Sequence, residues 1–427
     1  MRQRVRSLLQ GGFVFFLAIF ATSVSSFVFH VIFSRLLGPS RYGALGALLN
    51  LLLLLAVPLA AIQAVVTQTE SSRRSLGGYG IGVRPVILRA LVVGTVAMGV
   101  LMAVSPLVSS YLHFSSDWPI LVLSSWAVPS TVGAVLQGIL MGRLQFAAAS
   151  LAAVCGQVFG RLILGVLLFE VGLGFESAVI ASVASQFVST AILFIPLSSE
   201  FHQEKTQLTG IDLRSGYLPL LALVGYWIIG TEDTILARHF LSSHAAGLYA
   251  AASTAGGIAL FVPGPIAVIV FPKLSRHHGR GDLALTILKR SLGITALLGV
   301  ASAIVIATAP SFILKVLFGQ GYLEAANTVW ILGFESAVLG IIGVLIYFHL
   351  ARTSLGSLYA WFGAFIAFLG IEVFHNTRVE IADVMLGSAA VTLFILIASA
   401  ILAVLRDKRA DENPAVSGSL SFDSGVD

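Results

Sequence analysis

The feature that most constrains this chain is a succession of apolar runs, each as long as a membrane-spanning helix. The first, GGFVFFLAIFATSVSSFVFHVIF at 11–33, exceeds 20 residues, the length at which an α-helix crosses the hydrocarbon core of a bilayer. Transmembrane strands would instead alternate polar and apolar residues over ~10 positions. The pattern therefore predicts an all-α integral membrane protein.

Composition leads to the same class. Hydrophobic residues make up 57% of the chain and charged residues 11%, with a mean hydropathy of +0.96, whereas soluble domains carry roughly 25% charged residues. Such a surface must face lipid, where helices satisfy their own backbone groups. The N-terminal MRQRVRSLLQ resembles the charged region of a signal peptide. The apolar run that follows is longer than the 7–15 residues of a signal core, so we expect a retained first span.

Apolar runs of helix length predict twelve spans, six in each half of the chain. They lie near 11–33, 43–67, 85–112, 119–141, 147–169 and 176–197, and near 216–240, 246–271, 285–308, 326–351, 355–374 and 380–405. We expect an N-terminal six-helix bundle over 1–197, a cytoplasmic inter-lobe linker over 198–215 and a C-terminal six-helix bundle over 216–405. The stretch PSFILKVLFGQGYLEAAN ahead of the tenth span is predicted to be an amphipathic lead-in at the interface. The polar tail 406–427 is predicted to be disordered and cytoplasmic.

The distribution of basic residues predicts the orientation of these spans. With the N-terminus inside, 19 of the 25 Lys and Arg residues fall on the cytoplasmic side. Only Arg35, Arg41, Lys315 and Arg378 fall outside, and Arg161 and Arg238 lie within spans. By the positive-inside rule both termini are cytoplasmic.

A weak internal repeat relates the two halves. Each half has an arginine, a turn glycine and a proline in the same order: Arg35, Gly43 and Pro58, then Arg238, Gly247 and Pro263. Both stretches then exit to a basic cytoplasmic segment. Six spans per half give both halves the same topology, so we expect a parallel repeat with a pseudo-twofold axis along the membrane normal. The alternative is that Gly-bearing loops between helices simply look alike.

One arginine lies deep in a span, where an ionisable residue costs about 2.5–3.5 kcal/mol and normally faces a cavity or a partner. Arg161 has Gln157 four residues before it on the same helical face. Gly156 and Gly160 form a small-residue edge for close packing against another helix. Arg161 is either a cationic site for an anionic head group or a structural arginine paired with an acid.

Acidic residues lie in two other spans. Glu232 and Asp233 precede Arg238 in the seventh span at spacings unsuited to local pairing, and Glu335 lies within the tenth. We expect these acids to couple to a cation or to serve as charge partners. Arg238 itself is expected at the external interface, where its long side chain can reach water.

Polar side chains follow one face of the first span at a spacing of four residues. They are Thr22, Ser26 and His30, and Gln186 in the sixth span is a further candidate. Helical geometry groups the first three on one face, which predicts a wet cavity. Alternatively, the hydroxyls bond the carbonyls of their own helix.

Sequence motifs for chemistry are missing. The chain has no G-x-x-x-x-G-K-[ST], H-E-x-x-H or G-x-S-x-G, and no Cys/His spacing for a metal. Its single cysteine, Cys155, cannot form an intramolecular disulfide. We expect no catalytic residues, no metal, no cofactor and no nucleic-acid partner, and hence not an enzyme.

The stretch SRLLGPSRYGALGALLN resembles the first-loop signature A-R-x-L-G-x-x-x-Y-G of bacterial polysaccharide flippases, the oligosaccharidyl-lipid branch of the MATE-like superfamily. The matching residues are Arg35, Leu37, Gly38, Tyr42 and Gly43, while Ser34 replaces the usual small apolar residue. EDTILARHFLSSHAAGLYAAAS resembles the family's seventh span and its turn through Asp233, Gly247 and Tyr249. VIVFPKLSR and LFGQGYLEAANTVWIL extend the resemblance over nearly the whole chain.

The resemblance implies a twelve-helix, two-lobed fold in a bacterial cell membrane. It also implies a polyprenyl-diphosphate-linked oligosaccharide as cargo, with glycosyltransferases or a polymerase of the same pathway as partners. A diphosphate needs cationic donors, so Arg161 and Arg35 are the first candidates, and Arg35 is alternatively a residue that stabilises the turn. A cation-coupled drug exporter of the same superfamily and a non-transporting scaffold for cell-envelope synthesis stay open.

Overall fold

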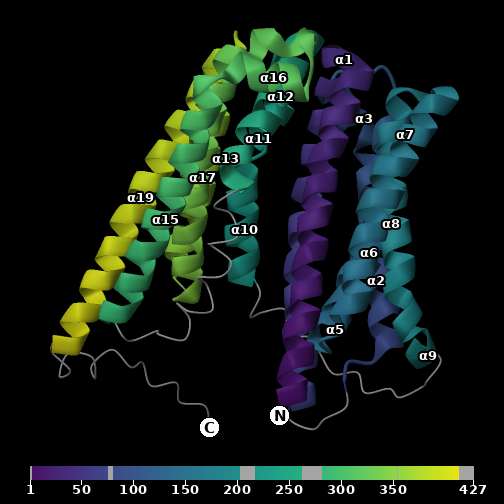
Figure 1. Ribbon diagram of the computed structural model, residues 1–427, viewed down its shortest axis with the longest axis vertical. Helices are drawn as coiled ribbons and strands as arrows, with labels where there is room; N and C mark the ends of the chain where they lie inside the picture. Colours follow the sequence, from purple (N-terminus) through teal and green to yellow (C-terminus); the bar gives the residue numbers. More distant parts are fainter. Residues whose placement is uncertain (1, 76–79, 202–216, 262–280, 353, 413–427) are drawn as a thin grey trace. The chain divides into compact units, whose positions relative to one another are not determined.

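The computed structural model describes residues 2–75, 80–201, 217–261, 281–352 and 354–412, and these residues form helices joined by short turns, without a strand (Figure 1). Nine of the described helices are long and apolar enough to cross a membrane, or ten if one bent pair counts as a span. The predicted class is confirmed: the protein is an all-α, multi-pass membrane protein.

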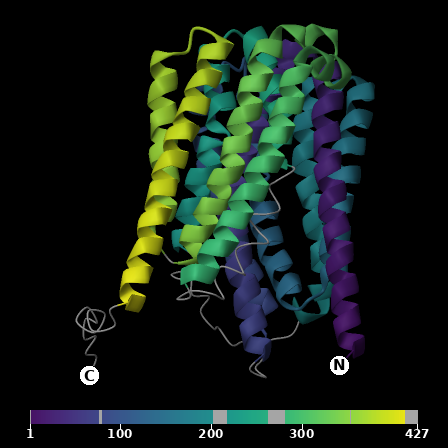
Figure 2. The same ribbon diagram turned by 60° about the vertical axis from the view of Figure 1, so that its left-hand side comes forward.

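The first helix, α1 (Arg2–Ser75), contains two antiparallel legs rather than one rod. His30 Nδ1 lies 3.0 Å from the Tyr42 hydroxyl, although twelve residues of straight helix would separate them by about 18 Å. The chain reverses at Gly38, whose φ of 69° and ψ of 171° lie outside the helical region and suit a residue without a Cβ. The two legs, which Figure 2 shows in purple and blue-violet, correspond to the predicted spans 11–33 and 43–67.

The next four predicted spans also match helices. The third is α2 (Val83–Ala103) with α3 (Ser105–Tyr111), and the fourth is α4 (Trp118–Ser124) with α5 (Ala127–Gly142). The fifth runs through α6 (Phe146–Val154), the π-helical η1 (Cys155–Ile163), α7 (Leu164–Leu168) and the π-helical η2 (Phe169–Leu173). The sixth is α8 (Phe175–Phe194), continued by η3 (Ile195–Leu197) and α9 (Ser198–Phe201).

The second half follows the same pattern. The seventh span is α10 (Tyr217–Ile229) and α11 (Glu232–Phe240), bent by 42°. The eighth begins with α12 (Ser243–Gly256) and α13 (Ile258–Phe261), and the rest of the predicted 246–271 lies outside the described residues. The others are α15 (Gly281–Thr308), α17 (Ala326–Ala351), η6 (Leu355–Leu358) with α18 (Tyr359–Val373), and α19 (Arg378–Glu412). The predicted interfacial lead-in is α16 (Pro310–Leu317) and η5 (Gln320–Ala325).

Two predicted boundaries need correction. Helix α19 continues to Glu412, beyond the residue-405 end at which the tail was expected to begin, because Arg406–Glu412 mixes good helix formers of both charges. Helix α9 carries the sixth span through Phe201, into the expected linker. The remaining linker residues 202–215 and tail residues 413–427 lie outside the described part of the chain.

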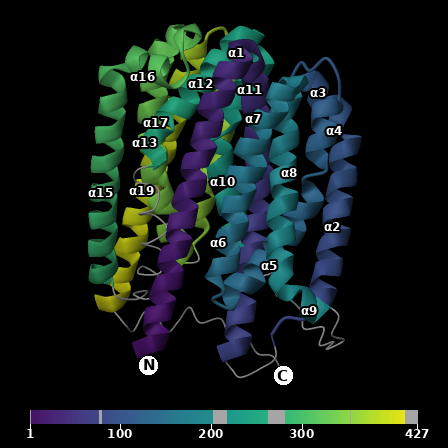
Figure 3. The same ribbon diagram turned by 45° about the vertical axis from the view of Figure 1, so that its right-hand side comes forward.

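The chain divides into two compact units. Unit 1 comprises Met1–Leu220, Thr234–Ala251 and Leu314–Ala325, and unit 2 comprises Leu221–Asp233, Ala252–Ile313 and Ala326–Asp427. In unit 1, helix α5 packs against α1, α2 and α8, and α4 packs against α2 and α8 (Figure 3). Helix α5 is buried along most of its length, and Gly138 lets it approach Val66 of α1, where a Cβ would lie 2.8 Å away.

In unit 2 the helix α17 is the central element. It packs against α15 on one side and α19 on the other, and α18 packs on α19 (Figure 2). Gly299 of α15 lies against Ala337 of α17, with 3.2 Å between the two Cβ positions. Small residues at these crossings bring the backbones together, as expected where association in lipid depends on close packing.

Candidate functional site

The π-helical segment η1 carries Arg161, which lies in unit 1. Gly160 and Gly156 of this segment face α8, where a Cβ on either residue would lie 2.9 Å from the backbone of Ser185. The predicted small-residue edge therefore packs against a neighbouring helix. A π-helical turn widens the backbone and is frequent at functional sites. In this protein it lies directly around Arg161.

Arg161 is held loosely by neutral groups. Its Nη1 donates to Ser26 Oγ and to Gln157 Oε1, each at 3.4 Å, and its Cζ lies 4.4 Å from the centre of the Phe29 ring. Its buried Nε has no hydrogen-bond partner, and no carboxylate pairs with it, among the described residues. Hydrogen bonds of 3.4 Å are long for this donor, so the guanidinium keeps much of its donor capacity.

The polar side chains predicted along one face of the first span differ in their contacts. Some reach the Arg161 site, and others bond within their own helix or to the next leg of α1. Ser26 reaches Arg161, and Ser25 donates to the Gln157 carbonyl at 3.2 Å. Thr22 instead bonds its own helix at Ile19. His30 is engaged by Tyr42 across the hairpin.

Gln186 and Arg35 make contacts elsewhere. The Gln186 amide lies against Gly133 of α5, 3.0 Å from the position of a Cβ. Arg35, which is exposed, donates from Nε to the Leu317 carbonyl at 2.9 Å and from Nη2 to the Val316 carbonyl. The structure therefore groups Arg161, Ser26 and Gln157, and gives Arg35 a contact with the end of α16.

The three predicted acids come together in unit 2. Glu232 and Asp233 occupy the first turn of α11, just past the bend that separates it from α10, where a helix N-terminus favours negative charge. Asp233 and Glu335 are 4% and 6% exposed, and the two carboxyl groups are near enough to interact electrostatically. One oxygen each of Glu232 and Glu335 has no hydrogen-bond partner within the described ranges.

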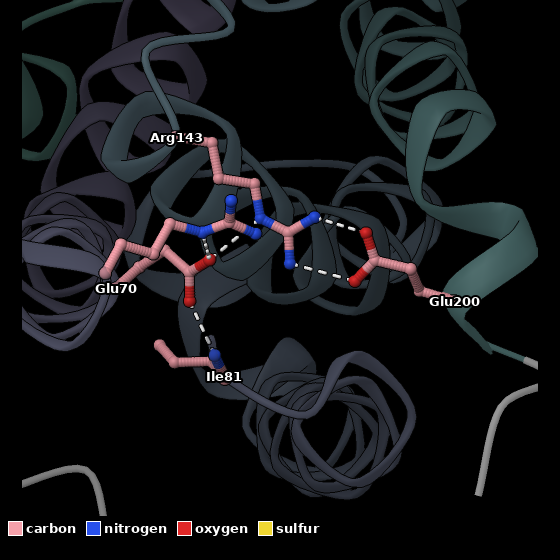
Figure 4. Close-up of polar contacts among 5 residues, drawn as sticks. Glu70, Ile81, Arg143 and Glu200 are labelled. Carbon is pink, nitrogen blue, oxygen red and sulfur yellow. Dashed lines mark hydrogen bonds and ion pairs between the residues drawn. The ribbon is translucent and has the colours of Figure 1, made fainter. Parts of the chain in front are cut away.

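The structure also contains an ion-pair network that the sequence did not predict (Figure 4). Glu70, at the end of the second span, accepts from Arg74 Nε and Arg143 Nε, both at 2.8 Å, and from the Ile81 backbone N–H at 2.6 Å. Arg143 also forms a bidentate pair with Glu200 at 2.5 and 2.9 Å. The network ties together the ends of the second, fourth and sixth spans. Only the Glu70–Arg74 spacing of four residues signalled it in advance.

The charges around Arg143 stabilise this ion-pair network. Burial by itself would lower the pKa of Arg143, but the hydrogen bonds and charges of Glu200 and Glu70 raise it above the ordinary arginine value. The Glu70 side chain is fully buried and Arg143 is 4% exposed. Gly142 makes room for Glu70, since a Cβ at that position would lie 2.7 Å from the Glu70 Cβ.

Comparisons with solved structures give the fold. An inward-facing multidrug resistance MATE family transporter of the MOP superfamily matches with a TM-score of 0.76 at 14% identity, covering 92% of this chain and 96% of that one. The lipid II flippase MurJ in an inward closed conformation matches with a TM-score of 0.68 at 14% identity, covering 97% and 94%. An outward-facing MATE family transporter matches with a TM-score of 0.67 at 14% identity, covering 94% and 96%. The chain therefore has the MATE-like fold.

Sequence comparison gives the family. No curated protein matches the chain. The pattern of a family described as "Polysaccharide biosynthesis protein" matches residues 32–327, which span the first-loop signature and the seventh-span stretch. By this match and the shared fold, the chain belongs to the polysaccharide biosynthesis protein family.

Proposed function

We propose that this protein is a flippase that moves a polyprenyl-diphosphate-linked oligosaccharide across the bacterial cytoplasmic membrane by alternating access, for export of a cell-surface polysaccharide. Family membership supports the polysaccharide pathway. The fold, which MATE transporters and the MurJ flippase share, supports transport. Both termini are proposed to be cytoplasmic, as the basic residues predict.

The observation that carries the proposal is the incomplete hydrogen bonding of Arg161. A guanidinium inside a membrane-spanning segment is costly unless it has a partner. Within the described part of the chain, Arg161 has only two long neutral hydrogen bonds, an aromatic ring and an unused Nε. An anionic ligand would supply the missing acceptors.

A diphosphate fits these donors well. The planar guanidinium fork matches phosphate oxygens in a bidentate arrangement. Ser26 and the Gln157 amide can add neutral donors once they release Arg161. Neutral donors suit a cargo that must leave again, because a second fixed cation would hold the anion more tightly.

The acid cluster Glu232, Asp233 and Glu335 is proposed as the coupling site. Two of its oxygens lack hydrogen-bond partners in the described residues, so a proton or a monovalent cation there would relieve repulsion between the carboxylates. This cluster also supports the second candidate function, a cation-coupled multidrug exporter. Arg161 favours the flippase, because a cationic drug would be repelled by it.

The test is accumulation of lipid-linked glycan in cells depleted of this protein and of redundant flippases. We expect a cytoplasm-facing intermediate to build up, and wild-type protein to clear it. Arg161→Ala should fail to clear it, whereas Arg161→Lys, which keeps the charge but loses the fork, should restore clearance in part. Phe159→Ala is the matched control, because Phe159 lies on the same segment with 56% of its surface exposed.

The outcomes separate the candidate functions. If the Arg161→Ala variant cleared the intermediate fully, the flippase function would stand, but Arg161 would not be its binding site. No accumulation on depletion would overturn the flippase in favour of the exporter or a scaffold. For the coupling site, Glu335→Gln should slow clearance, while Glu372→Gln, an exposed acid of α18, should not.

A further inference from the structure

Within unit 1, the first leg of α1 packs against the fifth span along one line of side chains (Figure 3). This packed line is buried and consists of Ser25, Phe29 and Phe33, spaced by four residues. Ser25 donates to the Gln157 carbonyl, and the Phe29 ring lies 4.4 Å from Arg161 Cζ. The Phe33 ring lies 3.0 Å from the position of a Cβ on Gly165. Each pair is 132 residues apart, so the two helices run parallel and in register.

A second line of side chains lies at the rim of this contact. It consists of Thr22, Ser26 and His30, again spaced by four residues, and each of them is half-buried. Arg161 and Gln157 are also half-buried. The two helices meet at this rim through Ser26, whose Oγ accepts from Arg161 Nη1 at 3.4 Å. Polar groups of both helices therefore share one edge that packing does not bury completely.

His30 lies on this edge beside the arginine. It is one helical turn beyond Ser26 on the same face of α1, and it is near enough to Arg161 to interact with it electrostatically. The His30 ring lies edge-on to the Phe29 ring, with 6.2 Å between the centroids, and Phe29 in turn contacts the guanidinium. The imidazole and the guanidinium therefore belong to one local group.

The second leg of α1 holds the other side of the imidazole. His30 Nδ1 lies 3.0 Å from the hydroxyl of Tyr42, a fully buried residue. When this hydroxyl donates to Nδ1, the hydrogen of the neutral imidazole is on Nε2. Within the described part of the chain, Nε2 makes no hydrogen bond. The edge thus has two unused donors, the Nε2–H of His30 and the buried Nε of Arg161.

The ligand that suits these two donors is an anion. Arg161 has a fixed positive charge and repels cations, and no carboxylate pairs with it among the described residues. Phosphate oxygens accept from a guanidinium fork and leave further lone pairs for a neighbouring donor. A neutral imidazole supplies that donor without adding a second fixed charge.

We propose that His30 is a binding residue of the Arg161 site, and that its Nε2–H donates to a phosphate-type anion held by the guanidinium. Tyr42 is the positioning residue that holds Nδ1. The choice of a lipid-linked diphosphate as the anion rests on the proposed function. A soluble phosphate compound has the same chemistry, so the experiment compares the two.

The test measures binding of two probes to the purified full-length protein in dodecyl maltoside, in phosphate-free buffer, by isothermal titration calorimetry. Farnesyl diphosphate represents a lipid-linked head group, and inorganic pyrophosphate represents a soluble anion. Farnesol, which lacks the diphosphate, reports binding of the chain alone. We expect farnesyl diphosphate to bind the wild type most tightly. Arg161→Ala should weaken its binding by about tenfold or more.

Two substitutions of His30 distinguish its ring nitrogens. Glutamine places an amide N–H near the position of Nε2, whereas asparagine places its amide near Nδ1. His30→Asn should weaken farnesyl diphosphate binding about tenfold, as loss of one hydrogen bond to a charged group does, and His30→Gln should stay within about threefold of wild type. Thr22→Val is the matched control, because the Thr22 hydroxyl donates to the Ile19 carbonyl of its own helix at 2.8 Å. It should bind both probes as the wild type does.

The positioning role of Tyr42 is tested by a double-mutant cycle. Tyr42→Phe should weaken binding about threefold when His30 is present. It should have no effect in the His30→Gln background, because glutamine has no Nδ1 for the hydroxyl to hold. A purely structural role of Tyr42 would instead give the same loss in both backgrounds.

Two outcomes would separate this inference from the proposed function. Wild-type affinity of His30→Asn, with binding still weakened by Arg161→Ala, would overturn the inference and leave Arg161 as the binding site. Wild-type affinity of Arg161→Ala, or no binding of either probe to the wild type, would overturn the site and the part of His30 in it. The glycan-accumulation assay would then still decide whether the protein is a flippase.

Two further outcomes concern the ligand and the fold. If pyrophosphate binds as tightly as farnesyl diphosphate and is weakened equally by His30→Asn, His30 is a binding residue for a soluble anion. If His30→Asn does not fold, as size-exclusion chromatography would show, His30→Met replaces it, because methionine fills the position without a donor. Wild-type affinity of that variant would overturn the inference.

Discussion

Arg143 and Arg161 lie in unit 1, only 18 positions apart in the sequence, and they are held in opposite ways. Arg143 is 4% exposed and shares two carboxylates through hydrogen bonds of 2.5 to 2.9 Å. Arg161 has two contacts of 3.4 Å to neutral groups and an unpaired Nε among the described residues. The protein supplies carboxylate acceptors to the Arg143 guanidinium, whereas the Arg161 guanidinium keeps an unpaired donor among the described residues.

This difference separates a structural cation from a binding cation. Removing one partner from a saturated, buried ion pair leaves the other charge stranded, so the fold depends on both. An arginine with spare donors contributes little to the fold and can accept an anion. The number of acceptors around each guanidinium therefore indicates its role better than its depth in the membrane does.

The largest expected effect on stability is that of Arg143→Ala. It should lower the free energy of unfolding by about 3–5 kcal/mol, because Glu70 stays fully buried without its main counter-ion. Titration with SDS in mixed micelles, followed by tryptophan fluorescence, would measure it. The double variant Glu70→Gln with Arg143→Ala should lose less than the sum of the two single changes. A loss below about 1 kcal/mol for Arg143→Ala would contradict this prediction, because it would mean that the Glu70–Arg143 pair contributes no more than an exposed ion pair does.

Gly142→Ala should come second, with a loss of about 1–3 kcal/mol from overpacking. The new Cβ would lie 2.7 Å from the Glu70 Cβ and 2.8 Å from the Thr67 carbonyl oxygen. Gly99→Ala is the matched control, since nothing lies within 4 Å of a Cβ there. The same unfolding titration should show Gly99→Ala unchanged or more stable. Equal losses for both variants would mean that helix packing around Glu70 is not the cause.

Arg161→Ala should lower the free energy of unfolding by no more than about 2 kcal/mol, the size of a desolvated cation–π contact such as the one with Phe29. It should nevertheless remove transport in the glycan-accumulation assay. This pairing of a small stability effect with a large functional one is the sharpest test of the comparison. A stability loss equal to that of Arg143→Ala would assign Arg161 to the fold instead.

Arg74→Ala should have the smallest effect, about 0.3–0.5 kcal/mol. Its side chain is 48% exposed, and it binds the same Glu70 oxygen as Arg143 does. Because the exposed pair is screened by salt and the buried one is not, raising the salt concentration should remove the Arg74 effect and leave that of Arg143. Persistence of the Arg74 effect in high salt would contradict this distinction.

Much of the helix order could be predicted from the sequence. Each predicted span that falls in the described residues coincides with a helix, because a run of ~20 apolar residues has no other stable form in lipid. The reversal at Gly38 followed from the turn between two such runs. The extension of α19 to Glu412 was missed because polarity of the tail was taken as disorder, although its residues also favour helix.

The candidate site was predictable only in part. Arg161 and Gln157 share a face by local spacing, so they could be paired from the sequence, and the structure adds Ser26 from the first span. Gln186 and Arg35 have partners from distant segments, 282 residues away in the case of Arg35 and Leu317. The Glu70–Arg143–Glu200 network joins three span ends, and single residues at span ends carry no periodic signal.

The sequence by itself determined that this is a helical membrane protein with its spans in a given order, because those properties follow from local hydrophobicity. It also placed two arginines, Arg161 and Arg238, and the acids Glu232, Asp233 and Glu335 inside spans, where a charge is costly unless it has a partner or a function. Only the tertiary structure decided which of these charges are satisfied. A guanidinium is structural or available according to the acceptors that other helices bring to it, and contacts such as Arg143 with Glu200 or Arg238 with Leu112 exist only after the helices pack.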